Sequence, residues 1–170
     1  MRRLVCFTVL ALALAAAAAG FALASSSDDG TLSVKAGIGK VSLNFNGSAV
    51  GRVARGEIRV TDPQIADGLG MQTWGCDTGS YDKTTIDGDG EVSVCRGTGL
   101  RFRAIGGKYQ IKLKGSGIYL SAVGQGSVWL NGAGDSPDVV SDGTYSLNDQ
   151  PYKSLPDIGT YVDLAAPTGG

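Results

Sequence analysis

The 170-residue chain contains no histidine, three cysteines and only two glutamates among its 16 acidic residues. Without histidine, a Ser-His-Asp triad, imidazole metal ligands and imidazole acid–base catalysis are excluded. Acid–base chemistry would therefore depend on carboxylates. The abundant aspartates, together with 27 glycines, form a composition typical of turns rather than helices. The chain is long enough for one domain with a single modest core.

The N-terminus has the pattern of a secretory signal. Met1-Arg2-Arg3 is basic, residues 4–24 are almost entirely apolar, and Ala22-Leu23-Ala24 is a small-residue cleavage site. We expect cleavage after Ala24. The alternative is an uncleaved membrane anchor formed by residues 4–24, since 21 helical residues span roughly 30 Å. Both alternatives predict a secreted or otherwise extracytoplasmic protein, with no other contact with the membrane.

Removal of the signal would leave Cys76 and Cys95 as the cysteines of the mature chain. An even number of cysteines in an oxidising compartment predicts a disulfide. In the chain-entropy model, closing this loop stabilises the fold by roughly 3 kcal/mol. The spacing differs from the C-x-x-C of redox-active pairs, so we expect a structural disulfide.

From Thr31 onward the apolar residues alternate with a period of two, as in residues 41–45 and 109–113. Each run ends at a glycine, which can adopt the positive φ of a tight hairpin turn. The pattern predicts an all-β fold, a single antiparallel β-sandwich or barrel-like domain, with the N-terminal signal as the one helix. A Gly-rich β-solenoid is the alternative, although no rung of fixed length recurs more than a few times. The expected order is signal (1–24), linker (25–30), β-sandwich domain (31–155) and flexible C-terminal tail (156–170).

Two pairs of segments are similar within the chain. Residues 39–48 align with 107–116, and residues 53–60 align with 123–130, with coincident apolar positions and glycines. This similarity suggests an internal duplication in which two hairpin units supply equivalent parts of the two sheets. Chance similarity among Gly-rich strands is the alternative interpretation.

Basic residues gather in the predicted strands, and residues 92–130 carry six Lys or Arg and no acid. Arg101, Arg103, Lys112 and Lys114 flank apolar residues and must face away from the core. They predict either a solvated face that deters aggregation or a basic face that holds an anionic envelope polymer or phospholipid headgroups. Nucleic acid is not expected, because aromatic residues are few and the mature chain is net negative.

Tyr119 and Trp129 stand out of phase with the apolar residues of their strands. If the outer faces of these strands are uncovered, both rings are exposed and suited to contact with carbohydrate. If both faces are covered, the two rings belong to the core. The predicted binding residues are therefore Arg101, Arg103, Lys112, Lys114, Tyr119 and Trp129.

Asp87, Asp89 and Glu91 place carboxylates at alternate positions, the spacing with which calcium-binding loops begin. The segment lacks the glycine and the distant glutamate of an EF-hand. A weak calcium site is one interpretation. The other is that Asp87-Gly88 and Asp89-Gly90 are hairpin-turn dipeptides that bind no metal.

Asp77-Thr78-Gly79-Ser80 resembles the active-site signature of the aspartic proteases. That resemblance implies an aspartate that activates water together with a second aspartate. The chain has no second copy of the motif, so the partner would come from a homodimer. An Asp-initiated turn beside the disulfide is the structural alternative. A secreted hydrolase using Asp77 is thus the alternative to a non-catalytic domain.

Several short motifs between Gly97 and Leu155 are of one general kind, rich in glycine or in alternating apolar residues: Leu100–Arg103, Gly106-Gly107, Gly115–Ile118, Leu120–Gly124 and Gly143–Asn148. In these stretches the chain resembles a class of uncharacterised secreted β-rich proteins of actinobacterial type. The resemblance implies an exported β-domain and carries no activity with it. The sequence as a whole favours a non-catalytic, envelope-associated binding or structural protein.

Overall fold

The structure, a computed structural model, describes residues 28–86, 89–134 and 141–166. These residues form one antiparallel sheet of eight strands and a single 3-10 turn, η2 (Ile65–Asp67). The predicted all-β antiparallel fold is confirmed. The expected signal helix lies outside the described residues, and among those that are described no helix has the length and apolarity needed to cross a bilayer.

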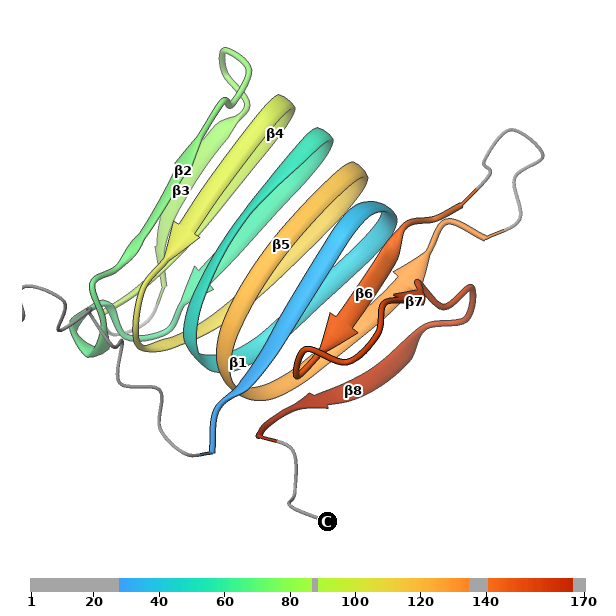
Figure 1. Cartoon of the computed structure of the whole chain (residues 1–170). Helices are drawn as coiled ribbons and strands as arrows, with labels where there is room; N and C mark the ends of the chain where they lie inside the picture. The colour runs from blue at the N-terminus through green and yellow to red at the C-terminus, as the bar shows by residue number, and fades with distance from the viewer. Residues whose placement is uncertain (1–27, 87–88, 135–140, 167–170) are drawn as a thin grey trace, which may run out of the picture.

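Three of the strands are very long, and Figure 1 shows them winding around one another as a flattened coil. Strand order across the sheet is β2-β4-β1-β5-β8, with β3 paired to β4, β6 to β1 and β7 to β6. The strands are β1 (Gly30–Asp62), β2 (Met71–Trp74), β3 (Tyr81–Ile86), β4 (Gly90–Ala104), β5 (Lys108–Gly132), β6 (Thr144–Leu147), β7 (Lys153–Ser154) and β8 (Thr160–Leu164).

The coil has a fixed turn length. Gly39 of β1 pairs with both Gly115 and Gly132 of β5, and Gly124 of β5 pairs with both Gly30 and Gly47 of β1. In each case the two partners are 17 residues apart, so one turn takes 17 residues. Successive turns of β1 are separated by an antiparallel segment of β5. The coil therefore has the regular turn of a solenoid but antiparallel neighbours.

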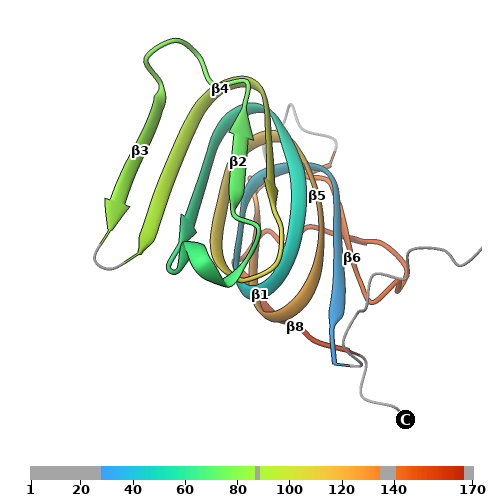
Figure 2. The ribbon, with the colours of Figure 1, turned by 90° about the vertical axis from the view of Figure 1, so that its left-hand side faces the viewer.

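Each turn crosses two layers that lie face to face (Figure 2). The core between them contains completely buried side chains from all three long strands, among them Ile58, Leu100, Ile111 and Val128. The layers thus pack like a β-sandwich although their strands are continuous. Layer A contains residues 30–38, 48–55, 98–104 and 116–123 with β2 and β6; layer B contains residues 40–46, 57–62, 90–96, 108–114 and 125–132 with β3 and β8.

The prediction that each apolar run ends in a hairpin turn is wrong for most of these glycines. Gly106-Gly107 does lie in the turn between β4 and β5, but the corner glycines lie within β1, β4 and β5, where the chain passes from one layer to the other. They pair with one another and form two rows at opposite edges of the coil. One row is Gly132, Gly39, Gly115, Gly56 and Gly97; the other is Gly30, Gly124 and Gly47.

Close approach of two backbones explains why these corner positions are glycine. Gly56 and Gly115 face each other with φ values of +151° and +141°, a region that L side chains rarely adopt. A Cβ on Gly56 would overlap the carbonyl oxygen of Lys114, and a Cβ on Gly115 would overlap that of Arg55. Any side chain at these corners would push the neighbouring turns apart.

The two most similar segments of the sequence are direct neighbours. Residues 40–46 pair antiparallel with residues 108–114 in layer B. They therefore do not supply equivalent parts of two sheets, as the duplication hypothesis proposed. Both segments run from one edge of the coil to the other, and both direct alternate apolar side chains into the same core. This shared role accounts for their similar sequences.

The sheet extends past the predicted domain end at residue 155. Within the expected tail (156–170), β8 pairs with β5 and buries Leu164, and the N–H of Ala166 donates to the carbonyl of Asp28 at 2.9 Å. The tail prediction is therefore wrong for β8. A single alternation of apolar residues, Val162 and Leu164, is too short a signal to identify an edge strand from the sequence.

We predict that Gly56→Ala lowers the free energy of unfolding by about 3 kcal/mol or more, because backbone overlap adds to φ strain. Gly79→Ala is the control, since Gly79 also has positive φ (+76°) but nothing within 4 Å of a Cβ. It should cost about 1 kcal/mol, from strain alone. Urea denaturation measures both. Equal losses would contradict a close approach at the corner.

Asp62, the last residue of β1, is a buried carboxylate with 2% of its surface exposed. Burial raises its pKa above the ordinary value of 3.8, the N–H of Gln64 opposes this by donating to Oδ1 at 3.1 Å, and the nearby Asp67 and Glu91 raise it further. The folded protein therefore binds this proton more tightly than the unfolded chain does.

Stability should consequently fall as pH rises from 3.8 through the folded pKa of Asp62, because the unfolded chain loses the proton first. Asp62→Asn should unfold at a higher urea concentration than the wild type at neutral pH, with the difference vanishing toward pH 3.8. Urea midpoints measured across this range test the prediction. A difference that does not change with pH would contradict it.

Candidate binding groove

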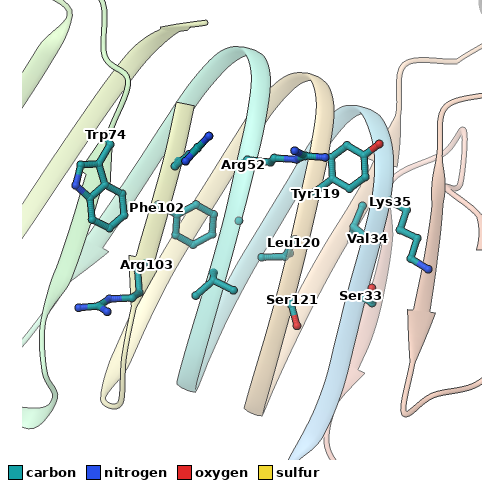
Figure 3. A pocket seen from close by; sticks show the side chains of 13 residues that line it. Ser33, Val34, Lys35, Arg52, Trp74, Phe102, Arg103, Tyr119, Leu120 and Ser121 are labelled. Carbon is teal, nitrogen blue, oxygen red and sulfur yellow. The ribbon is translucent and has the colours of Figure 1, made fainter. Parts of the chain in front are cut away.

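The outer face of layer A carries a row of cationic and aromatic side chains. Interstrand pairing places Tyr119, Arg52, Arg101 and Trp74 in line across β5, β1, β4 and β2. All four are exposed, because they alternate with side chains that enter the core. Lys35, on the first turn of β1, lies beyond Tyr119 at the end of this row (Figure 3).

A second row runs parallel to the first, two residues further along each strand. Ser33, Ser121, Val50, Arg103 and Gln72 follow one another across β1, β5, β1, β4 and β2. Between the two rows lies an open groove of about 520 Å³. It runs across the strands, so its residues come from segments far apart in the sequence.

The floor of the groove at its centre is the backbone of Gly51, which faces the core because its neighbours Val50 and Arg52 face outward. Gly51 pairs with Phe102 on one side and with Leu120 on the other. A Cβ there would lie 2.6 Å from Cε1 of Phe102, whose ring fills the space in the core beneath the glycine. The apolar floor is thus formed by backbone and by the tops of core residues.

The groove is positively charged. Lys35, Arg52, Arg101 and Arg103 line it, and none of its lining residues is acidic. Within the described part of the chain, both ion pairs lie elsewhere: Lys83 with Glu91, and Arg96 with Glu57. The four groove cations are therefore not neutralised by those acids and attract a negatively charged ligand.

Contacts within the groove orient its side chains before any ligand arrives. Cζ of Arg52 lies 4.2 Å from the centre of the Tyr119 ring, a cation–π stack that leaves guanidinium N–H groups free to donate. Nη2 of Arg103 donates to Oε1 of Gln72 at 3.3 Å. Trp74, 47% exposed, presents a large apolar ring at the far end.

Tyr152 lies next to the groove and contacts Lys35 and Ser33 at its end. Its ring lies 4.0 Å from Nζ of Lys35, and its hydroxyl is 2.9 Å from Oγ of Ser33. Hydrogen bonding with Lys35, and secondarily with Ser33, lowers the pKa of the Tyr152 phenol. This end of the groove is consequently more polar than the end at Trp74.

The structure divides the six predicted binding residues between two faces. Arg101, Arg103 and Tyr119 line the groove, which confirms that Tyr119 is exposed. The other three, Lys112, Lys114 and Trp129, lie on the outer face of layer B. The chain changes layer at the corner glycines, so residues with the same strand phase emerge on opposite faces.

Besides Trp74, the six predicted residues omit Arg52 and Lys35, which lie at the centre and at one end of the groove. Both stand out of phase with apolar neighbours, as Arg101 does, and that was the available signal. What the sequence did not provide was the pairing of Arg52 with Tyr119 and Arg101, because it depends on the turn length of the coil.

The predicted disulfide is confirmed, with the Cα atoms of Cys76 and Cys95 5.2 Å apart. Cys95 is completely buried in the core. The four-residue edge strand β2 ends at Trp74, and Cys76 lies two residues further along the chain. The disulfide therefore ties the end of β2, and with it Trp74, to the body of the sheet.

Asp77 lies in an exposed turn beside this disulfide. Its N–H donates to the carbonyl of Arg96 at 2.9 Å, and its own carbonyl accepts the N–H of Ser80 at 2.9 Å. Its carboxylate lies over Gly97, where a Cβ would come within 2.6 Å of it. This is the geometry of an Asp-initiated turn, in contrast to the proton-sharing carboxylate pair of an aspartic protease.

Of the three predicted calcium ligands, Asp87 lies outside the described residues. Asp89 is exposed, and Glu91 pairs with Lys83, whose Nζ is 2.7 Å from Oε2 and whose pKa the glutamate raises. Ile86 pairs with Gly90, as the hairpin interpretation requires. The described residues contain no group of three His, Cys, Asp or Glu arranged for a metal, and calcium stays a prediction.

Comparison of the chain with protein-family models, curated proteins and solved structures yields no match. The resemblance to secreted actinobacterial proteins therefore stays a prediction.

We predict that the double variant Cys76→Ser, Cys95→Ser is less stable than the wild type by roughly 3 kcal/mol, from the lost constraint on the unfolded chain. Urea denaturation under oxidising conditions measures the change. Wild-type protein treated with reductant is the control and should behave like the variant. An unchanged unfolding midpoint would show that the disulfide does not stabilise the fold.

Proposed function

We propose that this protein is an exported, non-catalytic binding domain of the cell envelope whose groove on layer A holds an anionic polysaccharide. The observation that carries the proposal is the row of Tyr119, Arg52, Arg101 and Trp74, extended by Lys35 and free of acidic residues. Export is supported by the signal-like residues 1–24 and by the disulfide, a bond typical of oxidising compartments.

The shape of the groove favours a polymer over a compact anion. Three strand-to-strand steps separate Tyr119 from Trp74, which at about 4.8 Å per step gives roughly 14 Å. A single phosphate or carboxylate would reach only one or two of the cations along this row. A chain of charged units can contact all of them at once.

The side chains favour sugar units. Guanidinium groups such as those of Arg52 and Arg101 donate in pairs to carboxylate, sulfate or phosphate oxygens. The exposed ring of Trp74 offers a flat apolar surface to the C–H face of a pyranose ring, and Tyr119 adds the ring face that Arg52 leaves uncovered. Together they suit a polymer that is both charged and carbohydrate.

The groove also supports binding rather than hydrolysis. Hydrolysis of a glycosidic bond requires two positioned carboxyl groups, and the residues that line the groove contain none. Asp77, on which the hydrolase alternative depends, lies in an exposed turn. A polymer held in this groove would therefore be retained without being cut.

We expect the double variant Arg52→Gln, Arg101→Gln to bind polygalacturonate at least about tenfold more weakly than the wild type, since each lost charge-assisted contact costs about 1.5–3 kcal/mol. The matched control is Lys40→Gln, Arg59→Gln, which removes two exposed charges from layer B. Isothermal titration calorimetry at low salt measures the affinities, and circular dichroism verifies folding.

Equal affinities for the two double variants would contradict the proposal, because binding would then follow net charge and not the groove. Tighter binding of single-stranded DNA than of polygalacturonate would replace it with a nucleic-acid function. Wild-type protein should also be retained on isolated cell wall at low salt and released as salt rises.

A further inference from the structure

The outer face of layer B contains a second depression, of about 440 Å³, on the opposite side of the molecule from the groove. Its floor consists of short polar side chains, Ser42 and Asn44 on β1 and Ser127 on the second turn of β5. Strand pairing places Ser127 directly beside Asn44. The floor is therefore low and hydrophilic, unlike the apolar floor of the groove.

Larger side chains border this floor on both sides. Trp129 pairs with Ser42 on one side and with Tyr161 of β8 on the other, so two aromatic rings form one wall. Lys112 and Gln110, on the first turn of β5, form the opposite wall. The depression thus lies along the direction of β1, between an aromatic wall and a polar wall.

The Trp129 ring of this wall is fixed in place. A Cβ on Gly159 would come within 2.5 to 2.7 Å of three atoms of the Trp129 indole, so the ring packs directly against the backbone there. Tyr161 is 75% exposed and available to a ligand. A ring already held by packing loses little conformational freedom when a ligand stacks on it.

Amide and hydroxyl groups face the aromatic wall. Within the described part of the chain, the side-chain amides of Asn44 and Gln110 make no hydrogen bond to other protein groups, and both residues are exposed. An amide donates and accepts at once, which matches the paired hydroxyls of a sugar ring. Lys112 is the single charged residue in the lining, so ionic attraction is weak here compared with the groove.

The floor of this depression offers no place for strand addition by a peptide. Residues 42–44 are paired with β5 on both sides, so their backbone offers no free edge. An apolar ligand would also find few partners among the serines and amides. The combination of the fixed Trp129 ring and the exposed Tyr161 ring with amides and hydroxyls is suited to a saccharide.

We propose that this face of layer B is a second binding site, specific for a neutral saccharide chain and independent of the groove on layer A. The inference does not rest on the proposed function of the groove. If both sites bind, one molecule holds two polymer chains on opposite faces and bridges them, which raises the overall avidity without any new contact.

The test titrates wild type and variants with cellohexaose and, separately, with the hexamer of N-acetylglucosamine, by isothermal titration calorimetry. At least one of the two should bind, and Trp129→Ala and Tyr161→Ala should each weaken that binding roughly five- to tenfold. Trp74→Ala is the matched control, an aromatic removed from layer A, and should leave it unchanged. Added salt should have little effect.

The proposal is overturned if neither oligosaccharide binds at millimolar concentration, or if Trp74→Ala abolishes binding while Tyr161→Ala does not. Tyr161 is exposed, so its variant does not disturb the core. Polygalacturonate binding by the same Tyr161→Ala protein tests the groove on layer A independently of the proposed saccharide site on layer B. It should equal that of the wild type whether or not the neutral saccharide binds.

Discussion

Close contact between backbones at two rows of glycines is the constraint on which this structure depends. Where Gly56 meets Gly115, no side chain fits between the two chains, and the strands can bend from one layer to the other without losing their pairing. A long strand that turns in this way encloses its own core. The fold needs neither helices nor many loops to bury its apolar residues, because each turn of the coil carries half of its residues to each layer.

The same constraint assembles both candidate sites. Since β1 and β5 wind together with a 17-residue turn, Arg52 comes to lie between Tyr119 and Arg101, residues from two other strands. On the other face the winding brings Trp129 beside Ser42. Each site is therefore a row across strands, and its spacing follows from the strand separation. Rigid sheet positions of this kind suit repetitive polymers better than small, enclosed ligands.

Much of the architecture was predictable from the sequence, because alternation with a period of two specifies strands, core positions and outward-facing cations. The disulfide was also predictable, because the mature chain has an even number of cysteines and an export signal. The pairing was not, since a glycine that ends a strand and one that bends it look alike in the sequence. Arg101 and Lys112 both alternate with apolar residues, yet the chain passes from layer A to layer B at Gly106-Gly107 between them, so they face opposite sides. Long-range register alone decides which cations act together.

The coil itself is tested most directly by backbone nuclear Overhauser effects in the folded protein. Continuous winding predicts contacts from Arg52 to both Tyr119 and Arg101, and contacts from Gly39 to both Gly115 and Gly132. A hairpin at Gly47 would instead bring Phe45 against Ala49, its neighbour across the turn. Observation of the first set would establish the coil and the row of groove residues; observation of the hairpin contact would contradict both.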